Sequence, residues 1–236
     1  MDGFVIGISG GVDSAVTSTL CALTGRPTLV VSMPIRQPEK ELTRANNHIA
    51  DLSSRFENVE SITVDLTPSF TQFEGDLPDD VSSDHLSMAN SRARLRMTTL
   101  YALAQAGNKL VCGTGNKVED FGIGFYTKYG DGGVDISPIG DLLKTEVWAV
   151  AKEIQVIEEI INAKPTDGLW HDERSDEDQI GASYPELEWA MNYKGDGSIL
   201  SDRQQEVLRI YSILNRANQH KMNPIPVCMI PEEIKY

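Results

Sequence analysis

A glycine pair stands between the first apolar run of the chain and a carboxylate. Residues 4–8 read Phe-Val-Ile-Gly-Ile, and residues 9–14 read Ser-Gly-Gly-Val-Asp-Ser. Two adjacent glycines weaken a regular element, but without a β-carbon they let the backbone come close to a ligand. The start of a helix offers N–H groups and the positive end of its dipole. With two serine hydroxyls as further donors, residues 9–14 are predicted to form a cradle for phosphate.

Asp13 would repel a phosphate in this cradle unless it also holds a metal ion. Mg²⁺ bound by a carboxylate and by phosphate oxygens removes the conflict. The segment is not a Walker A loop, because no Gly-Lys-Ser/Thr follows the glycines. The alternative is an ordinary turn from strand to helix, in which Asp13 only interacts with the helix dipole.

Short apolar segments alternate with helical patterns along the chain. Strands are predicted at residues 4–8, 28–33, 61–65 and 109–113. Helices are predicted at residues 12–24, 39–54, 86–104, 141–155, 156–163 and 202–217. The alternation predicts an α/β fold, a doubly wound parallel β-sheet with helices on both faces, in one domain over residues 1–236.

The predicted strands place the glycine turn where such sheets bind ligands, beyond the carboxyl ends of the strands. Residues 119–138 and 164–183 lack helical or strand periodicity. Long irregular segments in a compact domain are usually functional loops or disorder, so these two are further candidates for the site.

Composition narrows the class of protein. The chain has 236 residues and a formal net charge of −14, with no basic patch of the kind that nucleic-acid binding needs. No run approaches the roughly 20 apolar residues of a membrane span, and no secretory signal is visible. We expect a cytoplasmic protein in which Cys21, Cys112 and Cys228 are reduced core thiols.

The segment Ser-Gly-Gly-Val-Asp-Ser resembles the pyrophosphate-binding loop of the N-type ATP pyrophosphatases, which cleave ATP between its α and β phosphates. Other segments, in family order, resemble ammonia-dependent NAD synthetase, and TKYGDGG is the most specific of them. They are NSRARLRM (90–97), VCGTGNKVED (111–120), FYTKYGDGGVDISPIGDLLKTEVW (125–148), KPTDGLW (164–170) and HK (220–221).

The resemblance implies a role for each matching residue. The implied ATP-binding residues are Gly7, Ile8, Ser9, Gly10, Gly11, Val12, Asp13, Ser14, Thr114, Lys144 and Thr166. The implied Mg²⁺ ligands are Asp13 and Glu119. The implied deamido-NAD contacts are Arg94, Lys128, Asp135, His220 and Lys221. By pattern alone, most of the residues outside the glycine turn are better explained as solvated, loop or helix-capping side chains, and only the resemblance assigns them to the site.

The implied reaction joins ATP, deamido-NAD and ammonia. ATP adenylates the ring carboxylate, and ammonia then replaces AMP to give NAD⁺, the final step of NAD biosynthesis. No side-chain nucleophile is implied, so catalysis rests on positioning and electrostatics. No glutaminase domain fits within 236 residues, so free ammonia or an external partner is the expected nitrogen donor.

The resemblance also implies a homodimer that binds neither nucleic acid nor membrane. Relatives usually carry helices before the first strand that help to bury the dimer contact, whereas here the first predicted strand begins at residue 4. We therefore expect a trimmed, compact form. Ser32 stands where many relatives have an arginine that reaches ATP, and Arg36 is the candidate replacement.

The sequence is also compatible with two other functions. A tRNA-modifying thiolase of the same superfamily would need substrate-binding cysteines or a basic surface, and the acidic charge disfavours it. A non-catalytic nucleotide-binding domain would be expected to lose Asp13, Glu119 or Lys144, and all three are present.

Overall fold

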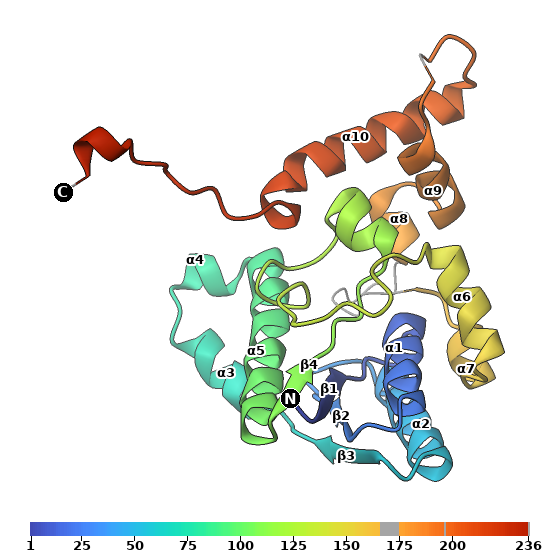
Figure 1. Ribbon diagram of the computed structural model, residues 1–236, viewed down its shortest axis with the longest axis vertical. Helices are drawn as coiled ribbons and strands as arrows, with labels where there is room; N and C mark the ends of the chain where they lie inside the picture. The colour runs from blue at the N-terminus through green and yellow to red at the C-terminus, as the bar shows by residue number, and fades with distance from the viewer. Residues whose placement is uncertain (166–174, 196, 236) are drawn as a thin grey trace.

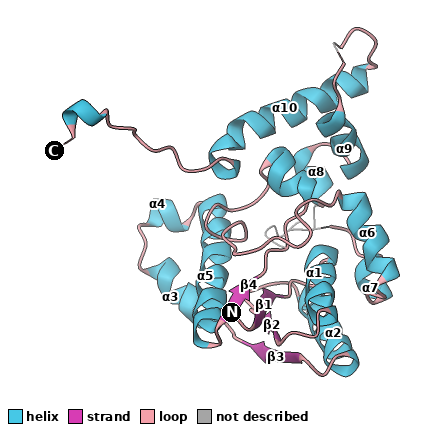
Figure 2. Cartoon of the chain, viewed as in Figure 1, coloured by secondary structure: helices cyan, strands magenta, loops and turns pink. Residues whose placement is uncertain are grey.

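A four-stranded parallel sheet forms the centre of the computed structural model, which describes residues 1–165, 175–195 and 197–235 (Figures 1 and 2). Its strands, in the order β3-β2-β1-β4, are β1 (Gly3–Gly7), β2 (Thr28–Ser32), β3 (Val59–Thr63) and β4 (Lys109–Val111). The chain moves outward from β1 to β3 and then returns to the other side of β1 for β4. This reversal creates the switch point at which open α/β sheets bind ligands.

Helices cover both faces of the sheet. The helical elements are α1 (Val12–Leu23), α2 (Glu39–Arg55), α3 (Thr67–Gly75), α4 (Asp79–Ser82), α5 (His85–Ala106), the π-helix η1 (Lys117–Ile123), α6 (Lys144–Glu153), α7 (Glu158–Ile161), α8 (Asp176–Ile180), α9 (Tyr184–Asn192), α10 (Asp202–Met222) and the short 3₁₀-helix η2 (Glu232–Ile234). Figure 1 shows α1 and α2 on one side of the strands and α3 and α5 on the other. The predicted doubly wound fold is confirmed.

The apolar run that opens the chain is buried on both faces of β1. Val5 packs in the cluster formed with α3 and α5, whereas its neighbour Ile6 packs in the cluster formed with α1 and α2. Neither residue has exposed surface. Successive side chains of a strand point to opposite faces, so a central strand of this sheet needs a continuous apolar run.

A second layer of helices lies beyond the carboxyl ends of the strands. Buried side chains of η1, α9 and α10 form one cluster around Val118, Leu187 and Val207. Another cluster joins α1 to α6 and α7 through Val16 and Val147. These two clusters fix η1 and α6 above the glycine turn, where they supply side chains to the site.

Several predicted boundaries are wrong. Strand β3 begins two residues earlier than predicted. It lies at the edge of the sheet and only its first residue, Val59, is buried, so its sequence carries little hydrophobic pattern from which to predict its bounds. The sequence pattern missed α3, α4, α8 and α9. It also missed η1 inside the segment predicted to be irregular, because a π-helix lacks the 3.6-residue period. Helix α10 continues to Met222, so His220 and Lys221 lie in its last turn rather than beyond it.

The three cysteines occupy two kinds of environment. Cys21 and Cys112 are buried, and their sulfur atoms lie 3.6 Å apart between α1 and the end of β4. Cys228 is exposed, so the prediction of a core thiol is wrong for this residue. No helix in the described part of the chain combines the length and apolar character that crossing a bilayer requires.

Candidate functional site

The glycine turn joins the end of β1 to the start of α1. Gly10 has φ of +87°, and a β-carbon at this position would lie 2.7 Å from the carbonyl oxygen of Glu41 in α2. Both facts require glycine at this position. Gly11 is the N-cap of α1, and no side chain caps the helix. The first-turn amides, which have no partners within a helix, therefore remain available to an anion.

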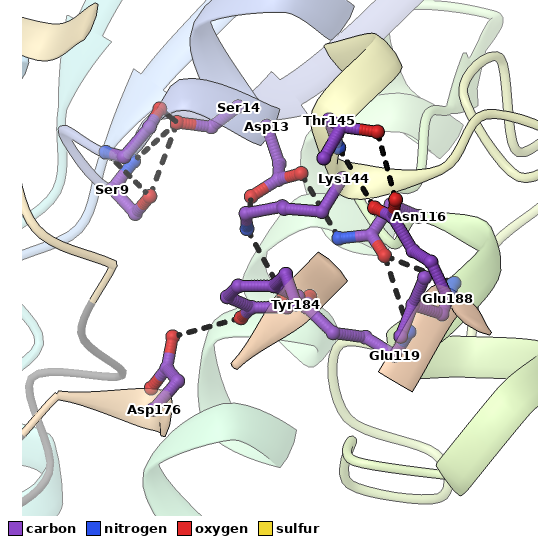
Figure 3. Close-up of polar contacts among 12 residues, drawn as sticks. Ser9, Asp13, Ser14, Asn116, Glu119, Lys144, Thr145, Asp176, Tyr184 and Glu188 are labelled. Carbon is purple, nitrogen blue, oxygen red and sulfur yellow. Dashed lines mark hydrogen bonds and ion pairs between the residues drawn. The ribbon is translucent and has the colours of Figure 1, made fainter. Parts of the chain in front are cut away.

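Two serines hold the turn in shape (Figure 3). The hydroxyl oxygens of Ser9 and Ser14 lie 3.1 Å apart, and the Gly11 amide donates to Ser9 Oγ at 3.2 Å. Ser14 Oγ donates to the carbonyl oxygen of Gly11 at 3.0 Å. The hydroxyls thus satisfy the backbone of the turn and fix its curvature before any ligand binds.

A buried lysine joins the two carboxylates that the resemblance singles out. Lys144 Nζ lies 2.5 Å from Asp13 Oδ2 and 3.0 Å from Glu119 Oε1, and its side chain is 2% exposed. The three residues come from α6, α1 and η1. Lys144 is the first residue of α6, where the helix dipole disfavours a cation. The two carboxylates therefore stabilise the positive charge of Lys144, which the dipole of α6 disfavours.

The charge states of this triad follow from burial and from the mutual attraction of its members. Burial opposes the charged form of Lys144, but Asp13 and Glu119 outweigh it and raise the lysine pKa. Burial raises the pKa of Asp13, and Lys144 offsets this only in part. Burial also acts to raise the pKa of Glu119, but Lys144, Tyr184 and Asn116 together lower it. The directions of these pKa shifts favour the charged forms of Lys144 and Glu119.

Asn116, at the start of η1, links the two acids. Its Oδ1 accepts hydrogen bonds from the amides of Val118 and Glu119, each at 3.1 Å, and its Nδ2 donates to Asp13 Oδ1 at 3.1 Å. The side chain is fully buried. Asn116 thus caps η1 and orients Asp13. The sequence pattern did not single out Asn116, and the signal that could have found it is the preference of helix N-caps for asparagine.

Helix α9 supports the triad from the other side (Figure 3). The hydroxyl of Tyr184 donates to Glu119 Oε1 at 2.5 Å. The carboxylate of Glu188 accepts from the amide of Thr145 at 2.9 Å and from its hydroxyl at 2.8 Å. Glu188 therefore caps α6 from a neighbouring helix, which fixes the position of Lys144 at the helix start.

A cavity of about 700 Å³ opens beside the triad. It is lined by the glycine turn, by residues of α2, α5, η1 and α10, and by the segment that follows β4. The residues singled out from the sequence that line it are Gly7, Ile8, Ser9, Gly10, Gly11, Val12, Asp13, Ser14, Thr114, Glu119, Lys144 and Lys221. The structure thus brings together residues from both ends of the chain.

Four other residues singled out from the sequence lie outside this lining. Arg94 Nε donates to the carbonyl oxygen of Lys128 at 3.2 Å, and Lys128 Nζ donates to the carbonyl oxygen of His220. These three form a chain of contacts from α5 to α10, which we call the rim. Asp135 accepts from the hydroxyl of Tyr101 at 3.0 Å and from the amide of Val111 at 2.9 Å. Thr166 lies outside the described residues.

Arg36 does not reach the cavity. Its guanidinium donates to Glu74 at 2.9 Å and to Thr71 at 2.7 Å, on the side of α3. The arginine that does line the cavity from this part of the chain is Arg44 of α2. The sequence pattern does not single out Arg44, because it lies in an amphipathic helix among other polar residues.

The parallel sheet, its switch point and the uncapped helix after a glycine turn define a nucleotide-binding α/β protein. A family model described as NAD synthase matches residues 1–224. An NH(3)-dependent NAD(+) synthetase of Methanosarcina acetivorans is 37% identical over 234 residues, which covers 96% of this chain and 90% of that relative. The chain belongs to the NAD synthase family.

Solved structures agree with this assignment. The NMN synthetase from Francisella tularensis superposes with a TM-score of 0.83 at 32% identity, over 98% of this chain and 90% of that one. The NH3-dependent NAD synthetase from Campylobacter jejuni, in complex with the nitrate ion, gives a TM-score of 0.76 at 26% identity, over 97% of this chain and 90% of that one. The predicted family is confirmed.

Proposed function

We propose that this chain is a ligase that forms a C–N bond, converting deamido-NAD and ammonia to NAD⁺ at the expense of ATP. The nicotinate carboxylate attacks the α-phosphorus of ATP and diphosphate leaves, which gives an acyl adenylate. Ammonia then attacks the acyl carbon, AMP leaves and a proton is released. The observation that carries the proposal is the buried lysine between two carboxylates beside the glycine turn, in a member of the NAD synthase family.

The chain's own groups are suited to the first step. Charge grows on the departing diphosphate, and the first-turn amides of α1 together with the ammonium of Lys144 oppose it. Removing one such preorganised donor typically raises a barrier by roughly 3–4 kcal/mol. The geometry is fixed before the substrate binds, because Asn116, Tyr184 and Glu188 hold the triad in place.

Mg²⁺ fits the donor set. Mg²⁺ is usually bound through one or two carboxylates together with substrate phosphates, and Asp13 and Glu119 offer such a pair facing the cavity. No group of three or more histidine, cysteine or acidic side chains suited to a metal occurs among the described residues, so phosphate oxygens would complete the coordination. When bound, the ion would neutralise charge on the phosphate chain.

The dinucleotide substrate is long, so its parts would contact different residues of the site. A dinucleotide that places its nicotinate carboxylate near the glycine turn would extend toward Lys221 and then along the rim of Arg94, Lys128 and His220. Guanidinium, ammonium and imidazole groups suit its phosphates. Asp135 and Thr166 belong to the same proposal through the family resemblance. We also propose that the protein is a cytoplasmic homodimer.

The direct test is a reconstituted reaction. Protein is mixed with Mg-ATP, ammonium chloride and deamido-NAD, and NAD⁺ and AMP are measured by chromatography. Equal amounts of both products are expected, and omission of any substrate should abolish them. Glutamine in place of ammonium should give none. ATP consumption that does not depend on deamido-NAD would overturn the proposal.

The likeness to an NMN synthetase makes the shorter mononucleotide a second candidate substrate. It carries the same ring carboxylate, so the chemistry is unchanged, but it lacks the part that would lie along the rim. We expect a higher kcat/KM for deamido-NAD than for nicotinic acid mononucleotide. The reverse order would reassign the substrate while keeping the reaction.

A further inference from the structure

Arg44 combines three features that the rest of the structure leaves unexplained. It lines the cavity from α2. Its Nε is buried and has no hydrogen-bond partner. Its β-carbon lies against the glycine turn, 3.4 Å from where a β-carbon on Gly10 would be. A buried guanidinium donor without a partner is costly to a folded protein, so a missing acceptor is indicated at this position.

Three other cations that line the cavity already have partners in the protein. Lys144 is held by Asp13 and Glu119. Arg96 Nε donates to the carbonyl oxygen of Met33 at 3.1 Å. Lys221 Nζ donates to two carbonyl oxygens, each at 2.8 Å. Arg44 is thus a cation next to the turn whose Nε remains available to a ligand.

The close packing of α2 on the turn explains how Arg44 reaches this place. A β-carbon on Gly10 would lie 2.7 Å from the carbonyl oxygen of Glu41 and 3.1 Å from the amide of Ala45. Only a glycine lets the helix come this near, so the turn and Arg44 form one structural unit. The distance between them is fixed by backbone packing rather than by a flexible loop.

We propose that Arg44 binds the phosphate chain of ATP at the glycine turn and retains the diphosphate as it leaves. The proposal rests on the proposed function, which requires an anion in this cradle. A guanidinium offers paired donors to phosphate oxygens in a fixed fork, which an ammonium does not. In a chain with a net charge of −14, such a local cation also offsets the repulsion that a polyphosphate would meet.

The test compares Arg44→Met, Arg44→Lys and the matched control Arg36→Met, whose arginine faces α3 instead of the cavity. Steady-state kinetics give KM for ATP and for deamido-NAD, and calorimetry gives the affinity of the unliganded protein for inorganic pyrophosphate. Loss of a charge-assisted phosphate contact is expected to cost about tenfold or more in affinity. Arg44→Met should show this loss for ATP and pyrophosphate, with KM for deamido-NAD within about twofold of wild type.

Arg44→Lys should recover part of the pyrophosphate affinity, because it restores the charge but not the fork. Arg36→Met should match wild type. Unchanged pyrophosphate and ATP binding in Arg44→Met would overturn the inference while NAD⁺ formation by wild type still stood. If wild type formed no NAD⁺, the pyrophosphate titration would still decide the role of Arg44. If Arg44→Met fails to fold, Arg44→Lys decides the question. An unaltered pyrophosphate affinity in Arg44→Lys would contradict the proposal that the guanidinium of Arg44 binds phosphate through its paired donors.

Discussion

The hydroxyl of Tyr184 donates to Oε1 of Glu119 at 2.5 Å, which joins α9 to η1 across 65 positions of sequence. Tyr184 is fully buried, and the ammonium of Lys144 lies 4.8 Å from the centre of its ring. The ring of Trp148 packs edge-on against it at 5.9 Å between centroids. One phenol therefore orients a carboxylate and, with its π face, stabilises a lysine cation.

Replacing Tyr184 by phenylalanine removes the hydroxyl and keeps the ring. Glu119 is a proposed Mg²⁺ ligand, and residues that orient a metal ligand typically contribute 10–100-fold to metal affinity or activity. We therefore expect the Mg²⁺ concentration for half-maximal activity to rise about tenfold. Binding of Mn²⁺ followed by electron paramagnetic resonance gives a readout apart from turnover. Tyr193→Phe is the control, because the hydroxyl of Tyr193 meets only the amide of Gly197 among the bonds described. Metal affinity unchanged in Tyr184→Phe would show that this hydroxyl does not position Glu119.

Asp13→Asn should separate catalysis from folding. The amide has nearly the same shape, and Lys144 keeps its contact with Glu119. We expect kcat/KM to fall by at least about 100-fold, with a melting temperature within a few degrees of wild type. Asp141→Asn serves as control, because Asp141 is an exposed acid paired with Lys117. A collapse of the melting temperature in Asp13→Asn would make Asp13 a structural residue instead.

Two glycines with similar backbone angles should respond differently to alanine. Gly10 has φ of +87° and a backbone oxygen 2.7 Å from its missing β-carbon, whereas Gly25 has φ of +73° and open space around it. Gly25→Ala should lower the free energy of unfolding by about 1 kcal/mol, the conformational cost alone. Gly10→Ala should cost roughly 3 kcal/mol, because α2 must also move. Urea denaturation measures both, and equal losses would mean that α2 yields without cost.

Stability should depend on pH through His48. Burial lowers the pKa of His48 from 6.5 to about 4, and its Nε2 lies 2.9 Å from Ser18 Oγ between α1 and α2. As pH falls below 6.5 the unfolded chain takes up a proton that the native imidazole does not. Stability is therefore lost between pH 6.5 and about 4, and the total is roughly 3 kcal/mol. No such effect acts above pH 7.

Urea denaturation at several pH values measures this contribution. Other acids also titrate below pH 5, so the informative quantity is the difference between wild type and His48→Gln, which keeps an amide near Ser18 but has no proton to gain. The wild type should lose more stability than the variant between pH 7 and pH 5. If the free energy of unfolding fell equally with pH in the wild type and in His48→Gln, the native pKa of His48 would not be lowered and the prediction would be wrong.

The sequence by itself determined the features that depend on neighbouring residues. The apolar run, the two glycines and the helix after them predicted the turn and its cradle, because strand burial, positive φ and uncapped amides are local properties. The alternation of strands and helices likewise predicted the doubly wound sheet. The family resemblance then named the chemistry, since its motifs keep their order along the chain.

Only the tertiary structure decided which side chains meet. Asp13 contacts Lys144, which is 131 positions away in the sequence, and Asn116, which is 103 positions away. No local sequence pattern encodes such pairs. Arg36 precedes α2 and Arg44 lies within it, and the local sequence gives no reason to prefer either as a ligand-binding arginine. The packing of α2 against Gly10 places Arg44, and not Arg36, in the lining of the cavity. Long-range contacts of this kind depend on how the layers of the fold pack. Packing sets the distances between helices and strands, whereas sequence spacing sets only the distances between residues of the same helix or strand.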